Sequence, residues 1–220
     1  MTYLVWLLFS FHLLPLLIFI FYRNTIGFSK LNLLISCLIF FSLLSDLIGV
    51  WLATSRFNTA PVSNSYQIVD RILVFLILNS VSIVSIRTKR LVVITSVLIS
   101  ICQLYYCISN GFLVQNDYIK LLSGVLICFY ALYTLFILIS SAELNPERLV
   151  INIWPVFAIF IYSASMLISQ MITNINDSVE FPILFRQIRQ GVALGSNVIR
   201  DSLFAYFFFL VKKMNYDDVK

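Results

Sequence analysis

Residues 31–54 read LNLLISCLIFFSLLSDLIGVWLAT, a run of 24 residues in which Asp46 is the one charged side chain. A helix that crosses the hydrocarbon core of a bilayer needs about 20 predominantly apolar residues. Helices in the core of soluble proteins are typically shorter or carry charged residues on one face. This run therefore predicts a transmembrane helix.

The same reading along the rest of the chain predicts seven such helices. They cover about residues 4–22, 31–54, 67–86, 91–108, 119–141, 150–172 and 183–211. The composition also indicates a membrane protein, because 60% of residues are hydrophobic and only 11% are charged. A soluble domain has about 25% charged residues. We expect a single all-α domain over residues 1–220, a polytopic bundle of seven transmembrane helices in a lipid bilayer. Disordered, collagen-like and nucleic-acid-binding proteins are excluded, the last despite a net charge of +5.

Turn and cap residues mark several helix ends. Asn145-Pro146-Glu147 predicts the start of the sixth helix, with Pro146 in its first turn. Pro61 separates the second helix from the third, and Asn110-Gly111 predicts a turn. We expect the first apolar run to be a retained helix and not a signal peptide, since no basic residue precedes it.

Lysine and arginine are unevenly divided between the two sides of the predicted bundle. With the N-terminus outside, two basic residues, Arg56 and Lys120, fall in outer segments. Nine fall in inner segments: Arg23, Lys30, Arg87, Lys89, Arg90, Arg148, Lys212, Lys213 and Lys220. Because basic residues accumulate in cytoplasmic loops, we expect an N-out, C-in protein of a bacterial inner membrane.

The last helix carries polar residues that a lipid-facing surface would not tolerate. At 100° per residue, six of them fall within one arc of about 120°. These six are Arg186, Arg189, Gln190, Asn197, Arg200 and Asp201. Ionisable groups inside a bilayer normally face the bundle interior, where they pair or bind a ligand. On the opposite side of the same helix, Gly191 and Gly195 form a Gly-x-x-x-Gly pattern that favours close helix packing.

Other predicted helices place polar residues at a similar depth. The first three helices contribute His12, Asp46, Asp70 and Arg71. The sixth helix adds Tyr162, Ser163, Ser165, Ser169 and Gln170. One interpretation is that the acids and arginines pair with one another and fix helix packing. The other is that surplus arginine faces an outward-opening cavity and binds a carboxylate, a phosphate or a lipid headgroup. Arg186, Arg71 and Asp70 are also near enough to the outer end to extend towards the interface.

The cysteines and the single histidine predict no metal centre. The cysteines, Cys37, Cys102, Cys107 and Cys128, lie in apolar runs and form no CxxC motif. One histidine does not build the usual transition-metal site. We expect no metal and no cofactor.

A seven-helix count alone does not identify a function. A retinal protein needs a lysine midway along the last helix, where this chain has Arg200. The aspartates stand singly on different helices, which does not favour an enzyme. We expect a sensor or membrane subunit that binds an anionic ligand outside and acts on a separate effector protein, at the inner face or in the membrane. A solute or lipid transporter using the same cavity, and a structural assembly subunit, are the alternatives.

Short motifs along the chain point to a family of membrane proteins. They are Ser45-Asp46-Leu-Ile-Gly49, Asn64-Ser-Tyr66, Ile151-Asn152, Tyr162-Ser163 and Asn197-x-x-Arg200-Asp201 followed by aromatic residues. Together they resemble a family of seven-helix integral membrane proteins of Bacteroidetes-type bacteria. The chain departs from that pattern at Val150, where the family has Trp, and at Arg186-Gln187, where it has His-Asn. The resemblance implies a fold and a membrane location, and the family has no established activity to carry over.

Overall fold

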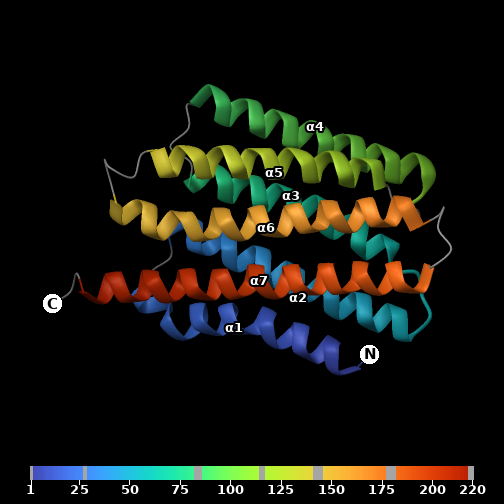
Figure 1. The fold of residues 1–220 in the computed structure, drawn as a ribbon, viewed down its shortest axis with the longest axis horizontal. Helices are drawn as coiled ribbons and strands as arrows, with labels where there is room; N and C mark the ends of the chain where they lie inside the picture. The colour runs from blue at the N-terminus through green and yellow to red at the C-terminus, as the bar shows by residue number, and fades with distance from the viewer. Residues whose placement is uncertain are drawn as a thin grey trace.

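The computed structural model is an all-α bundle of long helices (Figure 1). It describes residues 2–26, 29–81, 86–113, 117–140, 146–176 and 182–217. Within these ranges the helices are α1 (Thr2–Ile26), α2 (Lys30–Thr54), α3 (Ala60–Val81), α4 (Ile86–Asn110), α5 (Asp117–Ser140), α6 (Pro146–Asn176) and α7 (Pro182–Asp217). The prediction of an all-α, seven-helix bundle is confirmed.

Successive helices run in opposite directions, so the bundle has two distinct ends (Figure 1). We call one end the N-side: α1, α3, α5 and α7 begin there, and α2, α4 and α6 end there. The opposite end is the C-side. α7 packs between α1 and α6, and α5 packs on the far side of α6. α3 contacts α2, α4, α5 and α6 and is the most enclosed helix, while α4 contacts only α3 and α5 among the described helices.

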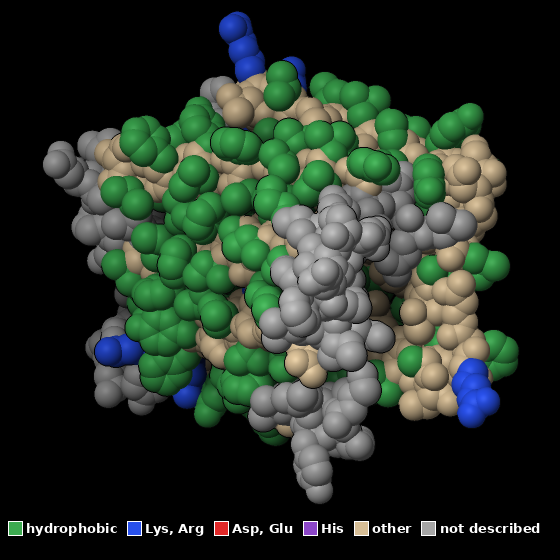
Figure 2. Space-filling view, turned by 45° about the vertical axis from the view of Figure 1, so that its right-hand side comes forward, with side chains coloured by type: hydrophobic (Ala, Val, Ile, Leu, Met, Phe, Trp, Pro, Cys, Tyr) green, Lys and Arg blue, Asp and Glu red, His purple; other side chains and the backbone are tan. Residues whose placement is uncertain are grey.

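Six of the helices are long and apolar enough to cross a membrane, and α3 is the exception among the described segments. The 22 residues of α3, at about 1.5 Å each, still match a hydrocarbon core of about 30 Å. Its polar residues are tolerated because four other helices surround it. The exterior of the bundle is apolar: Figure 2 shows one face covered largely by hydrophobic side chains, with Lys and Arg at its margins. On α4, Ile94, Leu98 and Ile108 are exposed while Gln103 is buried, as expected of a lipid-facing helix.

The predicted boundaries of the third and fourth helices were wrong. α3 begins at Ala60 and not at residue 67, because Asn58 Oδ1 accepts a hydrogen bond of 2.8 Å from the Ala60 backbone N–H. Pro61 therefore lies in the first turn of α3, where its missing N–H has no consequence. α4 begins at Ile86, so the basic residues 87–90 are helical.

Other predicted helix ends are confirmed. α6 begins at Pro146 and α7 begins at Pro182, as expected of proline in a first turn. The proposed cap residue Asn145 lies outside the described residues. α4 ends at Asn110, and Gly111 adopts the left-handed conformation with φ of +85°, which glycine accommodates without a steric penalty.

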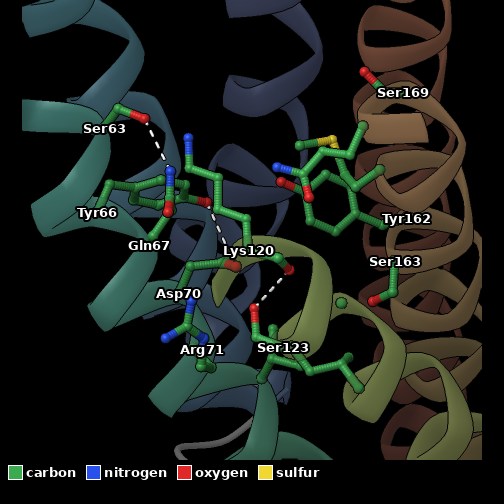
Figure 3. Close-up of a pocket in the computed structure, with 15 residues that line it drawn as sticks. Ser63, Tyr66, Gln67, Asp70, Arg71, Lys120, Ser123, Tyr162, Ser163 and Ser169 are labelled. Atoms are coloured by element: carbon green, nitrogen blue, oxygen red, sulfur yellow. Dashed lines mark hydrogen bonds between the residues drawn. The ribbon is translucent and has the colours of Figure 1, made fainter. Parts of the chain in front are cut away.

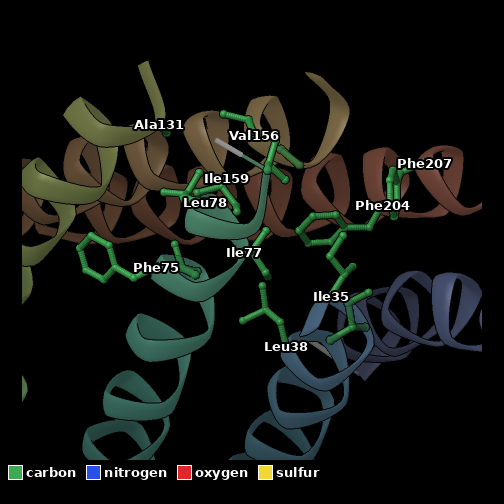
Figure 4. Packing of buried hydrophobic residues seen from close by; sticks show 14 of the residues in the cluster. Ile35, Leu38, Phe75, Ile77, Leu78, Ala131, Val156, Ile159, Phe204 and Phe207 are labelled. Carbon is green, nitrogen blue, oxygen red and sulfur yellow. The ribbon is translucent and has the colours of Figure 1, made fainter. Parts of the chain in front are cut away.

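The apolar core occupies the half of the bundle nearer the C-side. Figure 4 shows Ile35 and Leu38 of α2 converging with Ile77 of α3, Ile159 of α6 and Phe204 of α7. Each of these residues lies in the part of its helix that is nearer the C-side. The buried charged side chains His12, Arg71, Arg200 and Asp201 lie near the middle of their helices, and most residues that line the candidate cavity lie nearer the N-side.

Candidate functional site

Four charged side chains from three helices meet in the interior. His12 of α1 lies between two carboxylates: its Nε2 is 2.9 Å from Asp46 Oδ2 of α2, and its Nδ1 is 2.5 Å from Asp201 Oδ2 of α7. The first contact is a hydrogen bond, whereas the second is a close approach of a ring nitrogen to a carboxylate oxygen that lacks hydrogen-bond geometry and is an ion pair when His12 is protonated. His12 and Asp201 are fully buried.

Arg200 completes this charge network. Its Nε donates to Asp201 Oδ1 at 3.0 Å, and its Nη2 donates to Ser42 Oγ at 3.2 Å and lies 3.0 Å from the same Asp201 oxygen. The guanidinium also stacks 4.6 Å above the ring of Tyr162, a favourable cation–π geometry. Only 1% of Arg200 is exposed. These residues therefore pair with one another, as the pairing interpretation predicts, although His12 Nδ1, Asp201 Oδ2 and Arg200 Nη1 have no hydrogen-bond partner among the described residues.

A separate polar cavity of about 360 Å³ lies between α3, α5 and α6. Figure 3 shows α3 on one side of it, α6 on the other, and Lys120 and Ser123 of α5 between them. Each helix contributes one face, with positions three or four residues apart along the chain. The lining residues are Ser63, Tyr66, Gln67, Asp70, Arg71, Val74, Lys120, Ser123, Gly124, Ile127, Tyr162, Ser163, Met166, Ser169 and Gln170.

The charged groups of this cavity carry a net positive charge. Arg71 and Lys120 supply two cations, and Asp70 supplies one carboxylate, which accepts a hydrogen bond of 3.1 Å from the Tyr66 hydroxyl. Arg71 is only 2% exposed, and its Nη1 has no hydrogen-bond partner among the described residues. A buried guanidinium nitrogen without an acceptor is energetically unfavourable, and an anion in the cavity could provide one.

The other polar side chains at the cavity are hydroxyls and amides. Gln67 Nε2 donates to Ser63 Oγ at 3.0 Å. The amide oxygen Oε1 of Gln67 accepts a hydrogen bond of 3.3 Å from Nε2 of Gln103 on α4. Ser123 Oγ donates to the Lys120 backbone carbonyl at 2.9 Å. Hydroxyl and amide side chains of this kind can orient a bound polar group.

Gly124 allows α5 and α6 to approach closely beside the cavity. A Cβ atom at this position would lie 2.9 Å from Leu167 Cδ2 of α6. At Gly191 and Gly195, by contrast, a Cβ atom would meet nothing within 4 Å. The predicted close packing at those two glycines is thus not found within the described part of the chain.

The structure brings together His12, Asp46, Arg200 and Asp201, as the sequence suggested. Asp70 and Arg71 line the separate cavity and make no direct contact with Arg200. Asn197 is partly buried on α7 and does not line this cavity. The side chains of Arg186 and Arg189 lie outside the described residues.

The sequence reading missed the α5 wall of the cavity. Lys120, Ser123 and Gly124 line it, whereas Lys120 was counted from the sequence only as a basic residue at the outer end of the fifth helix. Their spacing of three to four residues was the available signal. Among the described residues, no group of His, Cys, Asp and Glu side chains could hold a metal ion.

Comparison with protein-family models, with curated proteins and with solved structures found no match. The resemblance to a bacterial seven-helix family therefore stays a prediction.

Proposed function

We propose that the protein is an integral membrane sensor or subunit whose cavity between α3, α5 and α6 binds an oxyanion. The oxyanion is a phosphate or carboxylate, carried by a small ligand or by a lipid headgroup. The observation that carries this proposal is the buried Arg71, whose Nη1 has no acceptor among the described residues while it lines a polar cavity with Lys120.

The chemistry of the lining fits an oxyanion. A guanidinium binds carboxylate or phosphate through two parallel hydrogen bonds, and an ammonium such as that of Lys120 adds a point charge. Serine and tyrosine hydroxyls can donate to the remaining oxygens. A volume of about 360 Å³ falls in the range of about 300–1,000 Å³ that is typical of small-molecule sites.

The position of the cavity favours binding over permeation. Val74 and Ile127 are the lining residues of α3 and α5 that lie nearest the C-side, and both belong to the apolar core. A transporter would need a second arrangement that opens this core towards the C-side. Uptake of labelled phosphate into proteoliposomes would favour that alternative.

We place the N-side outside the cell and the C-side in the cytoplasm of a bacterial inner membrane. The support is the excess of lysine and arginine near the C-side, including Arg23, Lys30 and Lys212. The same basic surface would attract a separate effector protein. We propose that oxyanion binding at the N-side changes the contacts of that effector.

Calorimetric titration of the full chain in lipid nanodiscs tests the binding site. The probes are inorganic phosphate, succinate and short-chain phosphatidylglycerol, with short-chain phosphatidylcholine as the zwitterionic comparator. Binding of at least one anionic probe, lost in Arg71→Gln and retained in Arg56→Gln, is expected, because Arg56 lies in the exposed α2–α3 connection. Phosphatidylglycerol alone would identify a headgroup site, and phosphate or succinate would identify a small-ligand site. Equal binding by both variants would reject the cavity.

A further inference from the structure

We propose that His12, held between Asp46 and Asp201, is a proton-binding site that exchanges with water through a second cavity. This site is separate from the oxyanion cavity and does not depend on it. Its elements are one buried imidazole, two carboxylates and an opening on one side.

The geometry around His12 requires an additional proton. Both ring nitrogens face a carboxylate oxygen, at 2.9 Å and 2.5 Å. A neutral imidazole carries one N–H, so its other nitrogen would present a lone pair to an oxygen that also carries lone pairs. An imidazolium carries a proton on both nitrogens, so it donates a hydrogen bond from Nε2 to Asp46 and faces Asp201 with a positively charged N–H, which removes this repulsion.

The charge balance of the cluster points the same way. Asp46 and Asp201 contribute two negative charges, and Arg200 contributes one positive charge. With an imidazolium the cluster is neutral, whereas with a neutral imidazole it has a net negative charge in the interior of a membrane protein. An uncompensated buried charge is strongly unfavourable.

The helices packed against α1 present no other charged partner to His12 in the described ranges. These helices are α2 and α7, and they contribute Asp46, Asp201 and Arg200. The Arg200 guanidinium stacks on Tyr162 of α6, and it interacts electrostatically with Tyr66 and Asp70 of α3 at longer range. The two carboxylates that contact His12 favour its protonated form, whereas its burial and the nearby charge of Arg200 oppose it.

Access to this site comes from Asp46. Its side chain is 36% exposed, while those of His12 and Asp201 are fully buried. Asp46 lines a second cavity of about 410 Å³, together with Gly49 and Ala53 on successive turns of α2 and Thr59 before α3. The cavity thus extends from the α2–α3 connection at the N-side to the Asp46 carboxylate.

The exchange consists of two balanced proton transfers. Hydronium in the cavity transfers a proton to Asp46 Oδ2 and becomes water. The protonated Asp46 then passes this proton to Nε2 of the neutral imidazole, which becomes an imidazolium while Asp46 returns to a carboxylate. Release runs in reverse and leaves the remaining ring proton on Nδ1, facing Asp201. Because His12 joins α1 to α2 and α7, each transfer changes the electrostatic attraction among these three helices. Tyr66 and Ser63 line both cavities, so the two sites share a wall.

Nitrogen NMR of the full chain in nanodiscs, with ring-¹⁵N histidine, tests the proposal. The chain has one histidine, so one imidazole is observed. At pH 7.5 an exposed histidine is mostly neutral, but both nitrogens of His12 are expected to be protonated. In Asp46→Asn the introduced amide can donate to Nε2, so a neutral ring with its proton on Nδ1 is expected. Asp70→Asn, in the other cavity, should keep the imidazolium.

Two results would overturn the proposal: a neutral ring in the wild-type chain at pH 7.5, or an unchanged imidazolium in Asp46→Asn. If Asp46→Asn does not fold, Gly49→Leu provides a second test of access. Gly49 lines the second cavity, and a Cβ atom at this position meets nothing within 4 Å, so the leucine is expected to fill part of that cavity. It should keep the imidazolium and slow proton exchange at least tenfold, and unchanged exchange would reject this route.

Discussion

Replacing Arg200 with methionine is the strongest test of the buried charge network. Arg200→Met keeps the length of the side chain but removes the guanidinium that pairs with Asp201. Breaking a buried ion pair by removing one partner destabilises a protein by about 3–5 kcal/mol. Asp201 retains its contact with His12, which places this contribution near the lower end, about 3 kcal/mol. Loss of the hydrogen bond to Ser42 adds about 1 kcal/mol.

The expected total is a loss of about 4 kcal/mol in the free energy of unfolding, or about a thousandfold in the equilibrium constant. It can be measured by unfolding in mixed micelles of increasing SDS content, followed by tryptophan fluorescence. Trp154 packs edge-to-face on Tyr206, with ring centroids 4.9 Å apart, so it reports separation of α6 from α7.

A matched control is Arg56→Met in the exposed α2–α3 connection, which should change stability by less than about 0.5 kcal/mol. Asp201→Asn should be more harmful than Arg200→Met, because both Arg200 and His12 lose their shared carboxylate. A loss of less than about 1 kcal/mol in Arg200→Met would refute the pairing of these buried charges.

Three further predictions follow from the same geometry. Without ligand, Arg71→Gln should lower the free energy of unfolding by less than about 1 kcal/mol in the same assay, because one guanidinium nitrogen already lacks a partner; a larger loss would indicate a structural role. Gly124→Ala should destabilise by about 1 kcal/mol through its contact with α6, while Gly191→Ala, with open space around its Cβ, should stabilise by about 0.5–1 kcal/mol through helix propensity; equal effects would contradict the packing described. In intact bacterial cells, a membrane-impermeant maleimide should label Arg56→Cys and not Lys213→Cys, and the opposite pattern would reverse the proposed orientation.

Much of the fold could be predicted from the sequence because lipid imposes a simple requirement on helix composition. A run such as residues 31–54 has no alternative environment that matches its apolar surface. α3 was less predictable because it is enclosed by four helices and need not be apolar all round. Its start depends on the cap formed by Asn58, a local hydrogen bond that a search for apolar runs does not detect.

The charge network was partly predictable for a similar reason. A buried aspartate, histidine or arginine in a membrane needs a partner, and this grouped His12 and Asp46 with Arg200 and Asp201. A helical projection gives only the angular position of a residue. It placed Gln190 on the same face as Arg200, yet Gln190 is exposed and Arg200 is buried, because they lie at different heights along α7.

The cavity could not be located from the sequence because its position depends on how three helices pack. Lys120 was counted only as a basic residue at the outer end of the fifth helix, and only the packing of α5 beside α3 and α6 shows that it lines the same space as Arg71. Gly124, which allows this packing, has no Gly-x-x-x-Gly partner to draw attention to it. Gly191 and Gly195 have that pattern, but no helix packs closely on them within the described chain.

The most direct test of oxyanion binding through Arg71, in the cavity between α3, α5 and α6, is the free energy of unfolding of the full chain. It is measured at increasing concentrations of inorganic phosphate, succinate or phosphatidylglycerol. A ligand that binds only the folded state adds about 2.7 kcal/mol at a hundred times its Kd. We expect this gain for at least one of the three anions in the wild-type chain and its absence in Arg71→Gln. No gain with any of the three anions, or an equal gain in both chains, would contradict the proposed site.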